Sequence, residues 1–330
     1  MKIFLYEYTC ANAKWSILPE SLRKEGLAML LALLQDFEAV PDVTTVTLLG
    51  ESFSHALPGE VHYHKGDERE QFTKLVKITD WTLVIAPEFN DILTTCCHWV
   101  ALANGRMLNA SQQAIELTAD KQRMAAHFIG NRIPTAEVVS CFSLGEPPRL
   151  SGDMYPVVIK PRYGAGSQST YLVRTPAEYR TCLELANQEE DVGQLLVTKY
   201  VPGMPISVAF LTGPAGEQAL LPAEQHLSED GRFLYRGGSI PLAEELTHRS
   251  VALATRAIQC IPGLVGYIGV DLILGDSDAV VEINPRLTTS YIGLRRLAKT
   301  NLAMAMLQTA LGNPVPIEWH EGKIEFRADG

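Results

Sequence analysis

Three side chains with oxygen donors, Asp271, Glu282 and Asn284, lie on two apolar runs that a short turn joins. The turn is Gly275-Asp276-Ser277-Asp278, so the spacing predicts a β-hairpin. Side chains alternate along a strand, so Glu282 and Asn284 share a face and the hairpin brings Asp271 beside them. Oxygen donors of these types suit a hard cation such as Mg²⁺ or Mn²⁺. The alternative is a half-buried hairpin with a wet polar face, but the nearby Arg286 favours a metal site.

A second candidate site lies in residues 155–173, which are typical of a strand, a loop and a second strand. Lys160 ends the first strand, and Gly164, Gly166 and Ser167 lie in the loop. Such a backbone can wrap phosphate oxygens with its N–H groups. The loop lacks the residue order of a Walker A motif, and no GxGxxG opens a helix after the first strand. A lysine before a glycine loop, with an acidic hairpin about a hundred residues later, indicates a nucleotide site.

Four stretches of the chain resemble the ATP-grasp ligases. They are Asp120-Lys121 at a helix start, VVIKPRYGAGS around Lys160, LLVTKYVPGMPISVAFL around Lys199, and the VDLIL…VVEINPRLTTS hairpin. The resemblance runs from about residue 106 to the end and implies an α/β (α+β) ATP-grasp fold. Within the superfamily, the start of the chain and the stretch NPRLTTSYIGLRRL are most similar to the tyramine–glutamate ligases of methanofuran-type cofactor biosynthesis.

The resemblance implies ATP-binding roles for individual residues. The lysines that reach the ATP phosphates in the family correspond to Lys121 and Lys160, and the loop over residues 163–168 would close on the nucleotide and exclude water. The hinge that lines the adenine corresponds to Thr198, Lys199, Tyr200 and Val201. The family commonly has an acid at the position of Thr198 and a second acid, which holds the ribose, where this chain has Pro205. The ribose contact therefore stays open.

The activity implied by the resemblance is carboxylate activation by ATP. A substrate carboxylate takes the γ-phosphoryl group, and an amine then displaces phosphate from the acyl phosphate to give an amide. Glu282 would bridge the metal ions, and Arg286 would stabilise the transferring phosphoryl group or the tetrahedral intermediate. Arg236 could hold a carboxylate or the γ-phosphate as a bidentate donor, with a surface position as its alternative.

The expected substrates are glutamate with tyramine or tyrosine. Another ATP-grasp amino-acid or peptide ligase is an alternative, and so is a non-catalytic nucleotide-binding module. An intact set of metal donors together with both lysines argues against the module. Small-molecule carboxylates and amines are thus the expected partners. Homodimers are common for such folds, but nothing in the sequence demonstrates one.

The N-terminal residues 1–105 alternate between predicted strands (2–8, 43–49, 81–86) and predicted helices (18–38, 67–79, 90–104), which indicates an open parallel α/β domain before the ATP-grasp part. Ligands bind such sheets at the carboxyl ends of strands. Glu7 and Glu88 follow two strand ends, so they are candidates to hold a substrate amine, with surface solvation as the alternative. The adjacent Cys96 and Cys97 fit a helix interior better than a redox or metal site.

The remaining chain is predicted to form two further units, a lid-like subdomain over 106–198 and a C-terminal subdomain over 199–330 that carries the metal site. The second contains predicted strands at 205–212, 218–225 and 232–239, and helices at 243–259, 291–299 and 302–311. This arrangement positions the hairpin and the glycine loop on opposite sides of the nucleotide.

Bulk composition narrows the function further. The 330 residues carry a net charge of −10, which argues against nucleic-acid binding. No run of about 18 apolar residues predicts a membrane span. The chain enters a strand directly after Met1-Lys2, so we expect no signal peptide. Six cysteines without CxxC pairing predict reduced thiols in a cytoplasmic protein.

Overall fold

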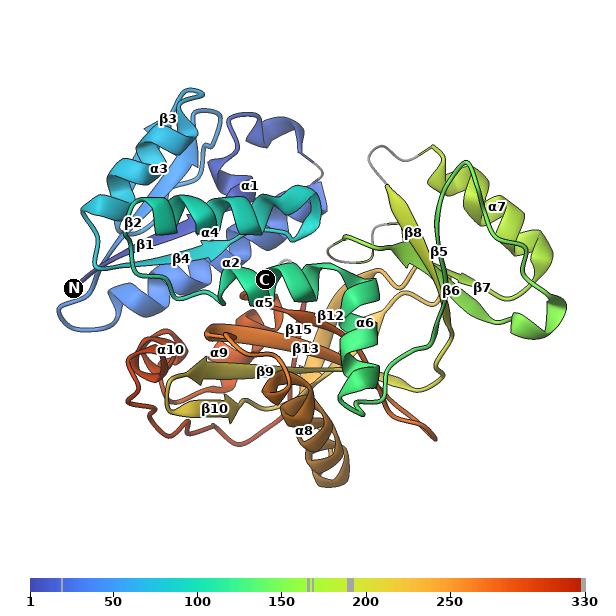
Figure 1. Cartoon of the computed structure of the whole chain (residues 1–330). Coiled ribbons are helices and arrows are strands. Elements are labelled where there is room, and N and C mark those ends of the chain that lie inside the picture. Colours follow the sequence, from blue (N-terminus) through green and yellow to red (C-terminus); the bar gives the residue numbers. More distant parts are fainter. Residues whose placement is uncertain (19, 165–166, 168, 189–192, 328–330) are drawn as a thin grey trace.

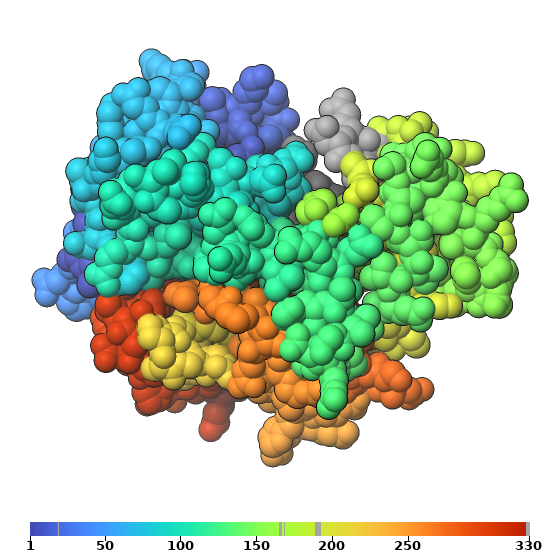
Figure 2. Space-filling model, viewed as in Figure 1, coloured from blue at the N-terminus to red at the C-terminus, as the bar shows by residue number. Residues whose placement is uncertain are grey.

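The computed structural model describes residues 1–18, 20–164, 167, 169–188 and 193–327, and in these residues the strands form three β-sheets (Figure 1). A parallel sheet belongs to the N-terminal part, a larger antiparallel sheet lies below it in the view, and a small antiparallel sheet stands to one side. Figure 2 shows the small sheet and its helix as a separate lobe. The open parallel α/β arrangement that the sequence predicts for the N-terminal residues is confirmed.

The N-terminal sheet is parallel and has the strand order β3-β2-β1-β4. Its strands are β1 (Lys2–Glu7), β2 (Thr44–Gly50), β3 (Glu60–His64) and β4 (Trp81–Ile85). The helices are α1 (Tyr8–Ala11), α2 (Glu20–Glu38), α3 (Glu68–Lys77) and α4 (Ile92–Leu102), with 3-10 turns at Trp15–Ile17 and Phe89–Asp91. The strand order reverses between β1 and β4, so their carboxyl ends flank the crevice where open α/β sheets bind ligands.

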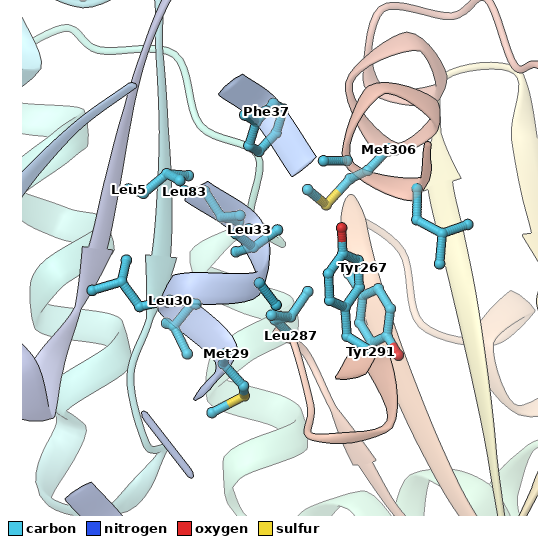
Figure 3. Close-up of a cluster of buried hydrophobic side chains, with 14 of the residues drawn as sticks. Leu5, Met29, Leu30, Leu33, Phe37, Leu83, Tyr267, Leu287, Tyr291 and Met306 are labelled. Carbon is cyan, nitrogen blue, oxygen red and sulfur yellow. The ribbon is translucent and has the colours of Figure 1, made fainter. Parts of the chain in front are cut away.

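Helix α2 lies between this sheet and the C-terminal part of the chain (Figure 3). Leu5 on β1 and Leu83 on β4 lie on one side of the helix, whereas Tyr267 and Tyr291 of the C-terminal part lie on the other. Each large apolar side chain buried here contributes about 1.5–3 kcal/mol of transfer free energy. A helix that is buried on two sides therefore joins the two parts of the molecule firmly.

The large sheet is antiparallel and has the order β14-β13-β9-β11-β12-β15 among the described strands, with β10 paired to β9. Its strands are β9 (Met204–Gly213), β10 (Gly216–Ala219), β11 (Ala223–Leu227), β12 (Tyr235–Ile240), β13 (Gly266–Leu274), β14 (Ala279–Asn284) and β15 (Ile324–Arg327). The single strand predicted over 218–225 is wrong. The chain forms β10 and β11 instead, with Pro222 between them, because proline has no N–H to give to a ladder.

Helices cover both faces of the large sheet. They are α8 (Glu244–Gln259), α9 (Ser290–Leu297) and α10 (Leu302–Ala310). Leu211 and Tyr267 pack in the cluster that contains α9 and α10, whereas Phe210 and Ile268 pack on the opposite face with α8. By strand alternation Asp271 shares the face of Tyr267. At Asp271 this face borders a cavity.

The small sheet has the order β5-β8-β6-β7 and its own hydrophobic cluster. Its strands are β5 (Val138–Ser143), β6 (Val157–Pro161), β7 (Tyr171–Val173) and β8 (Gln194–Lys199), with a 3-10 turn at Gly152–Met154 and the helix α7 (Pro176–Ala186). The preceding helices α5 (Gln112–Ala119) and α6 (Lys121–Gly130) do not contribute to the hydrophobic cluster of the small sheet. Their side chains, such as Ile115 and Phe128, join the cluster that contains α8 and β13.

The cysteines are free thiols. Cys96 and Cys97 are buried in α4, and burial raises the pKa of the Cys96 thiol to about 12 and that of Cys97 further. Both therefore stay protonated at neutral pH.

Among the described residues, no helix combines the length and the apolar character that a membrane crossing requires.

Candidate active site

A cavity of about 290 Å³ lies between the small sheet and the large sheet, and α2 contributes to its wall. The residues that α6, β6, the loop after it and the β13–β14 hairpin supply form what we call the polar part: Lys121, Lys160, Ser167, Asp271, Glu282 and Asn284. Residues 198–205 and their neighbours form what we call the hinge side. The remaining wall, which we call the α2 side, is formed by Glu25, Met29, Leu227, Phe233, Tyr235, Arg286, Thr288, Thr289 and Ser290.

The predicted hairpin is formed by β13 and β14, and it brings the three oxygen donors together. Asp271 lies directly opposite Glu282, and Asn284 lies opposite Gly269. The side-chain amide of Asn284 donates to Oδ2 of Asp271 at 3.0 Å. On the other carboxylate oxygen, the amide of Gln225 donates at 3.0 Å. Two strands of the sheet thus fix the orientation of the Asp271 carboxylate.

Lys121 reaches the hairpin from the first residue of α6. Asp120 begins this helix, because its Oδ1 accepts hydrogen bonds from the backbone N–H groups of Gln122 and Arg123 at 3.1 Å. The Nζ of Lys121 then lies 2.8 Å from Oε2 of Glu282, and it also donates to the carbonyl oxygen of Gly164 at 2.8 Å. One ammonium group therefore connects the acidic hairpin with the glycine loop.

Lys160 lies on β6 with its side chain in the cavity, because Val157 and Ile159 of the same strand turn into the cluster of the small sheet. The pKa of Lys160 is lowered to about 8, mainly by burial and also by the charge of Lys121, against the opposing effect of Glu282 and Asp271. A polyanion in the cavity would favour the charged form of this amine.

The two facing carboxyl groups have pKa values shifted in opposite directions. Burial and the negative charge of Glu282 raise the pKa of Asp271 to about 7. Burial also acts to raise the pKa of Glu282, but the positive charges of Lys121, Lys160 and Arg286 hold it below its ordinary value. The cluster thus concentrates charge that is only partly balanced, which is typical of a functional site.

The donor set of the hairpin fits a hard divalent cation. It consists of two carboxylates and one carboxamide, and Mg²⁺ is usually held by one or two carboxylates together with waters and substrate phosphates. The pKa of Asp271 is raised by burial and by the like charge of Glu282, and a cation bound by the two carboxylates would remove that repulsion. Asp271, Glu282 and Asn284 are therefore the residues that would hold such an ion.

The glycine loop can be followed only in part. Gly164 accepts the hydrogen bond from Lys121, and the Ser167 hydroxyl donates to the carbonyl oxygen of Phe233 at 2.5 Å. Gly166, which we expect to cradle phosphate, lies outside the described residues. Phe233 lies between β11 and β12, so this contact joins the small lobe to a connection of the large sheet on the α2 side of the cavity.

The predicted hinge residues Thr198, Lys199, Tyr200 and Val201 line the cavity, and so does Pro205. The backbone N–H of Tyr200 donates to Pro156 at 3.2 Å, and that of Lys199 donates to Glu137 at 2.9 Å. Apolar side chains of β6 and β13, such as Val158 and Ile273, complete this side. Such a slot suits a planar apolar ring system, and no acidic side chain of the hinge stands beside it.

Arg286 lines the cavity but is paired with Glu88. Its Nη2 donates to Oε2 at 3.0 Å, and its Nε lies 2.9 Å from Oε1 without hydrogen-bond geometry. The Arg286 side chain is 13% exposed and that of Glu88 is 6% exposed, so the ion pair is largely withdrawn from water. Glu88 therefore connects the crevice of the parallel sheet to the cavity through Arg286.

Glu7 and Arg236 lie outside the cavity wall, as do Glu88 and Gly164. Glu7 is buried, and its carboxylate accepts hydrogen bonds from the Thr9 hydroxyl at 2.6 Å and from the Cys10 N–H at 2.7 Å, which caps α1. Arg236 is exposed on β12, whereas its neighbour Tyr235 lines the cavity. This is the surface position that the sequence left as the alternative for Arg236.

The α2 side of the cavity contains residues that sequence reasoning missed. Glu25 is an acid in the second turn of a helix, where it is typical of a solvated position, and Met29 reads as an ordinary core residue. Tyr235 and Gln225 lie on strands whose register could not be known in advance. Only Thr288, Thr289 and Ser290 carried a signal, because they follow the hairpin within the motif NPRLTTS.

Sequence patterns of known families match most of the chain. The sequence pattern of an ATP-grasp domain matches residues 107–290, and that of a pre ATP-grasp 3 domain matches residues 53–115. A tyramine–L-glutamate ligase of Methanocaldococcus fervens is 26% identical over 315 residues, which cover 93% of this chain and 94% of that protein.

Solved structures with a similar fold include other proteins of this kind. A putative ATP-grasp superfamily protein from Archaeoglobus fulgidus superposes with a TM-score of 0.74 at 24% identity, covering 99% of this chain and 92% of the other. An L-amino acid ligase from Bacillus licheniformis superposes with a TM-score of 0.67 at 16% identity, covering 94% and 74%. At these identities the likeness supports the fold alone.

Proposed function

Since the chain belongs to the ATP-grasp family and is one of its carboxylate–amine ligases, we propose that it joins glutamate to tyramine or tyrosine. The observation that carries the proposal is the convergence of Lys121, Lys160 and the Asp271–Glu282 pair in one cavity between two sheets. The finer substrate assignment is supported by the full-length similarity to a tyramine–L-glutamate ligase.

ATP would lie with its base on the hinge side and its phosphates in the polar part. Lys121 and Lys160 would offset the charge of the phosphates and hold the γ-phosphoryl group in place. When bound, Mg²⁺ would supply charge neutralisation between phosphate oxygens, held by Asp271, Glu282 and Asn284. Binding of the polyanion would favour the protonated form of Lys160, whose pKa burial lowers to about 8.

The reaction would proceed in two transfers. An oxygen of the substrate carboxylate attacks the γ-phosphorus, the bond to the bridging oxygen breaks, and ADP leaves with that electron pair. The amine nitrogen then attacks the acyl carbon, the C–O bond to phosphate breaks, and the amine loses a proton. Arg286 would stabilise negative charge on the transferring group or on the tetrahedral oxygen. Ser167 and its neighbours would exclude water from the acyl phosphate.

Another amino-acid or peptide ligase of the family is the second candidate. The observation in its favour is that the α2 side has a carboxylate, hydroxyls and apolar surface together, a mixture that suits many amino acids. In that case the reaction steps and the roles of the polar part stay the same. Only the carboxylate and amine substrates would differ.

Mass spectrometry of the products tests the proposal. The purified protein is incubated with ATP, Mg²⁺, L-glutamate and a pool of tyramine, tyrosine and common amino acids. We expect an ATP-dependent product with the mass of glutamate plus tyramine or tyrosine minus water. ADP formation without that mass would keep the ligase chemistry and reject the substrate pair. No ADP and no amide with any carboxylate would reject catalysis.

A further inference from the structure

Four residues with large apolar side chains line the α2 side of the cavity, and we call them the apolar patch. They are Met29 of α2, Leu227 of β11, Tyr235 of β12 and Phe233 of the connection between these two strands. Leu227 and Tyr235 are paired directly across the two strands, so their side chains lie on the same face of the sheet. Met29 lies at the opposite end of the labelled buried cluster from Phe37 (Figure 3). The apolar patch therefore combines the N-terminal domain with the large sheet.

Two members of the apolar patch have no part in the core that the described residues form. Met29 is buried in the cluster around α2, and Tyr235 packs against the same cluster. Phe233 and Leu227, by contrast, are only partly buried, and neither belongs to any of the three hydrophobic clusters of the described residues. Apolar surface of this kind, inside a cavity and beside a few polar groups, is typical of a ligand site.

Phe233 has a backbone conformation that is unusual for a bulky residue. Its φ is 54°, which lies in the left-handed region. Hydrogen bonds within the connection hold this conformation. The Ser228 N–H donates to the carbonyl oxygen of Leu234, and the Leu234 N–H donates to the Ser228 hydroxyl, both at 2.9 Å. Strained residues that their surroundings hold in place cluster where a chain contacts a ligand.

The small lobe holds the same connection from its other side. The Ser167 hydroxyl donates to the carbonyl oxygen of Phe233 at 2.5 Å, and the Leu172 N–H of β7 donates to the carbonyl oxygen of Gly231 at 2.7 Å. Ser167 belongs to the loop that we expect to close on the phosphates. The position of Phe233 is therefore fixed relative to the part of the cavity where the acyl phosphate would form.

The chemistry of the apolar patch favours one of the two substrates of a carboxylate–amine ligase. Glutamate has charged groups at both ends and two methylene groups between them, so it has little apolar surface to bury. An arylalkyl amine such as tyramine carries a ring, which gains from burial against apolar and aromatic side chains. The adenine has its own apolar surface on the hinge side, at Val158 and Ile273. The apolar patch is thus suited to the amine.

We infer that the apolar patch binds the ring of the amine substrate, and that Phe233 determines the specificity for it. The inference rests on the proposed function, because only a ligase that acylates an amine has such a substrate. It adds to that function a preference for arylalkyl amines over small polar amines, since a small amine gains nothing from the apolar patch.

The test compares Phe233→Ala with the wild type for two nucleophiles at saturating ATP and glutamate. Tyramine has a ring for the apolar patch. Hydroxylamine has no apolar body, and its nitrogen attacks the acyl carbon, so that phosphate leaves and a hydroxamate forms. We expect the KM for tyramine to rise about ten- to a hundredfold, as for the loss of one apolar side chain from a buried contact. The KM values for hydroxylamine, ATP and glutamate should stay within twofold of the wild type.

Leu234→Ala is the matched control, because Leu234 follows Phe233 in the same connection, is 46% exposed and does not line the cavity. Its KM for tyramine should stay within twofold of the wild type. Phe233→Leu is a second variant, which keeps an apolar side chain but loses the ring. It should raise the KM for tyramine several-fold, and it decides the question if Phe233→Ala does not fold.

Three results would overturn the inference. One is a KM for tyramine that does not change when Phe233 is replaced. Another is an equal increase for tyramine and hydroxylamine, which would indicate a general disturbance of the site. The third is a higher KM for ATP with an unchanged KM for tyramine, which would assign the apolar patch to the nucleotide.

Failure of the proposed function gives a different result. If the wild type forms the hydroxamate of glutamate but no amide with tyramine or tyrosine, the substrate assignment fails, and the amine that does react decides the inference. A small polar amine overturns it, whereas an apolar amine whose KM rises in Phe233→Ala supports it. If the wild type forms neither hydroxamate nor amide with any carboxylate, both proposals are rejected.

Discussion

The polar part of the cavity and its α2 side are held together by different kinds of interaction. In the polar part, charged groups are buried close together, and burial is the main reason why the pKa of Asp271 is raised to about 7 and that of Lys160 is lowered to about 8. On the α2 side, the charged groups behind the wall are paired with one another, as Arg286 is with Glu88. We infer that the first region is organised for ligands and the second for a fixed shape.

The two regions also differ in the distance between their components along the chain. Asp271 and Glu282 meet within one hairpin, whereas Arg286 and Glu88 are separated by 198 residues. Packing of the N-terminal sheet against the C-terminal part is what brings that pair together. Substitutions in the polar part should therefore affect catalysis with little effect on stability, and substitutions behind the α2 side should affect stability and substrate binding.

The largest effect on activity is expected for Glu282→Gln. The neutral side chain keeps the shape of glutamate but loses the charge that attracts Lys121 and that would hold a divalent cation. We expect ATP-dependent ADP release to fall by about a thousandfold or more, with a melting temperature close to that of the wild type. Glu244→Gln, an exposed change at the start of α8, is the control. Near-normal ADP release from Glu282→Gln would contradict the assignment of the polar part.

A large loss of stability is expected for Glu88→Gln. The variant leaves the Arg286 guanidinium buried without a counter-charge, and breaking such a pair typically costs about 3–5 kcal/mol. Chemical denaturation measures this change in the free energy of unfolding. The double variant Glu88→Leu with Arg286→Met should recover most of the stability, because neither charge remains. A loss below about 1 kcal/mol in the single variant would show that the pair does not support the wall.

Sequence reasoning worked best where function depends on neighbours along the chain. The hairpin at 271–284 could be predicted because strand alternation and one turn fix the relative positions of its side chains. Lys121 and Lys160 came from a family resemblance, and both line the cavity. The open parallel sheet followed from alternating apolar runs. In each case the relevant information lies within a few residues.

What could not be predicted depends on packing between distant elements. Glu25 reads as a solvated helix residue, and only the docking of α2 against the large sheet brings it to the cavity. Glu88 was expected to hold an amine, but its carboxylate is occupied by Arg286, which no local pattern indicates. The direction in which Arg236 points depends on the register of β12, and that register is set by pairing with β11 and β15.

A smaller effect, mainly on substrate binding, is expected for Asp36→Asn. Asp36 on α2 accepts hydrogen bonds from Arg295 at 2.6 Å and from the Tyr291 hydroxyl at 2.6 Å, so it joins α2 to α9. Losing its charge should reduce stability by about 1–2 kcal/mol. The shift of α2 should raise the KM of a substrate that contacts the α2 side of the cavity several-fold and leave the KM for ATP unchanged. Equal increases in both KM values would indicate that the two regions are coupled.

The smallest effect, on the order of 1 kcal/mol, is expected for Asp120→Asn, which precedes Lys121 of the polar part and has a structural role. The Asp120 carboxylate accepts hydrogen bonds from Nε and Nη2 of Arg162 at 2.9 and 2.6 Å. Burial acts to raise the pKa of Asp120, but the hydrogen bonds from Arg162 and the backbone lower it below its ordinary value. A group with a lowered folded-state pKa stabilises the protein above its unfolded-state pKa of about 3.9, and this stabilisation is lost as the pH falls through the folded-state pKa.

The difference in unfolding free energy between the wild type and Asp120→Asn should therefore be constant above about pH 5 and shrink as the pH falls below about 4. Denaturation at a series of pH values measures this difference. Asp276→Asn, in the exposed turn of the hairpin, should show no such pH dependence and serves as the control. A difference that grows toward low pH would mean that the Asp120–Arg162 contact does not stabilise the fold. The start of α6, and with it Lys121, would then be held by the backbone alone.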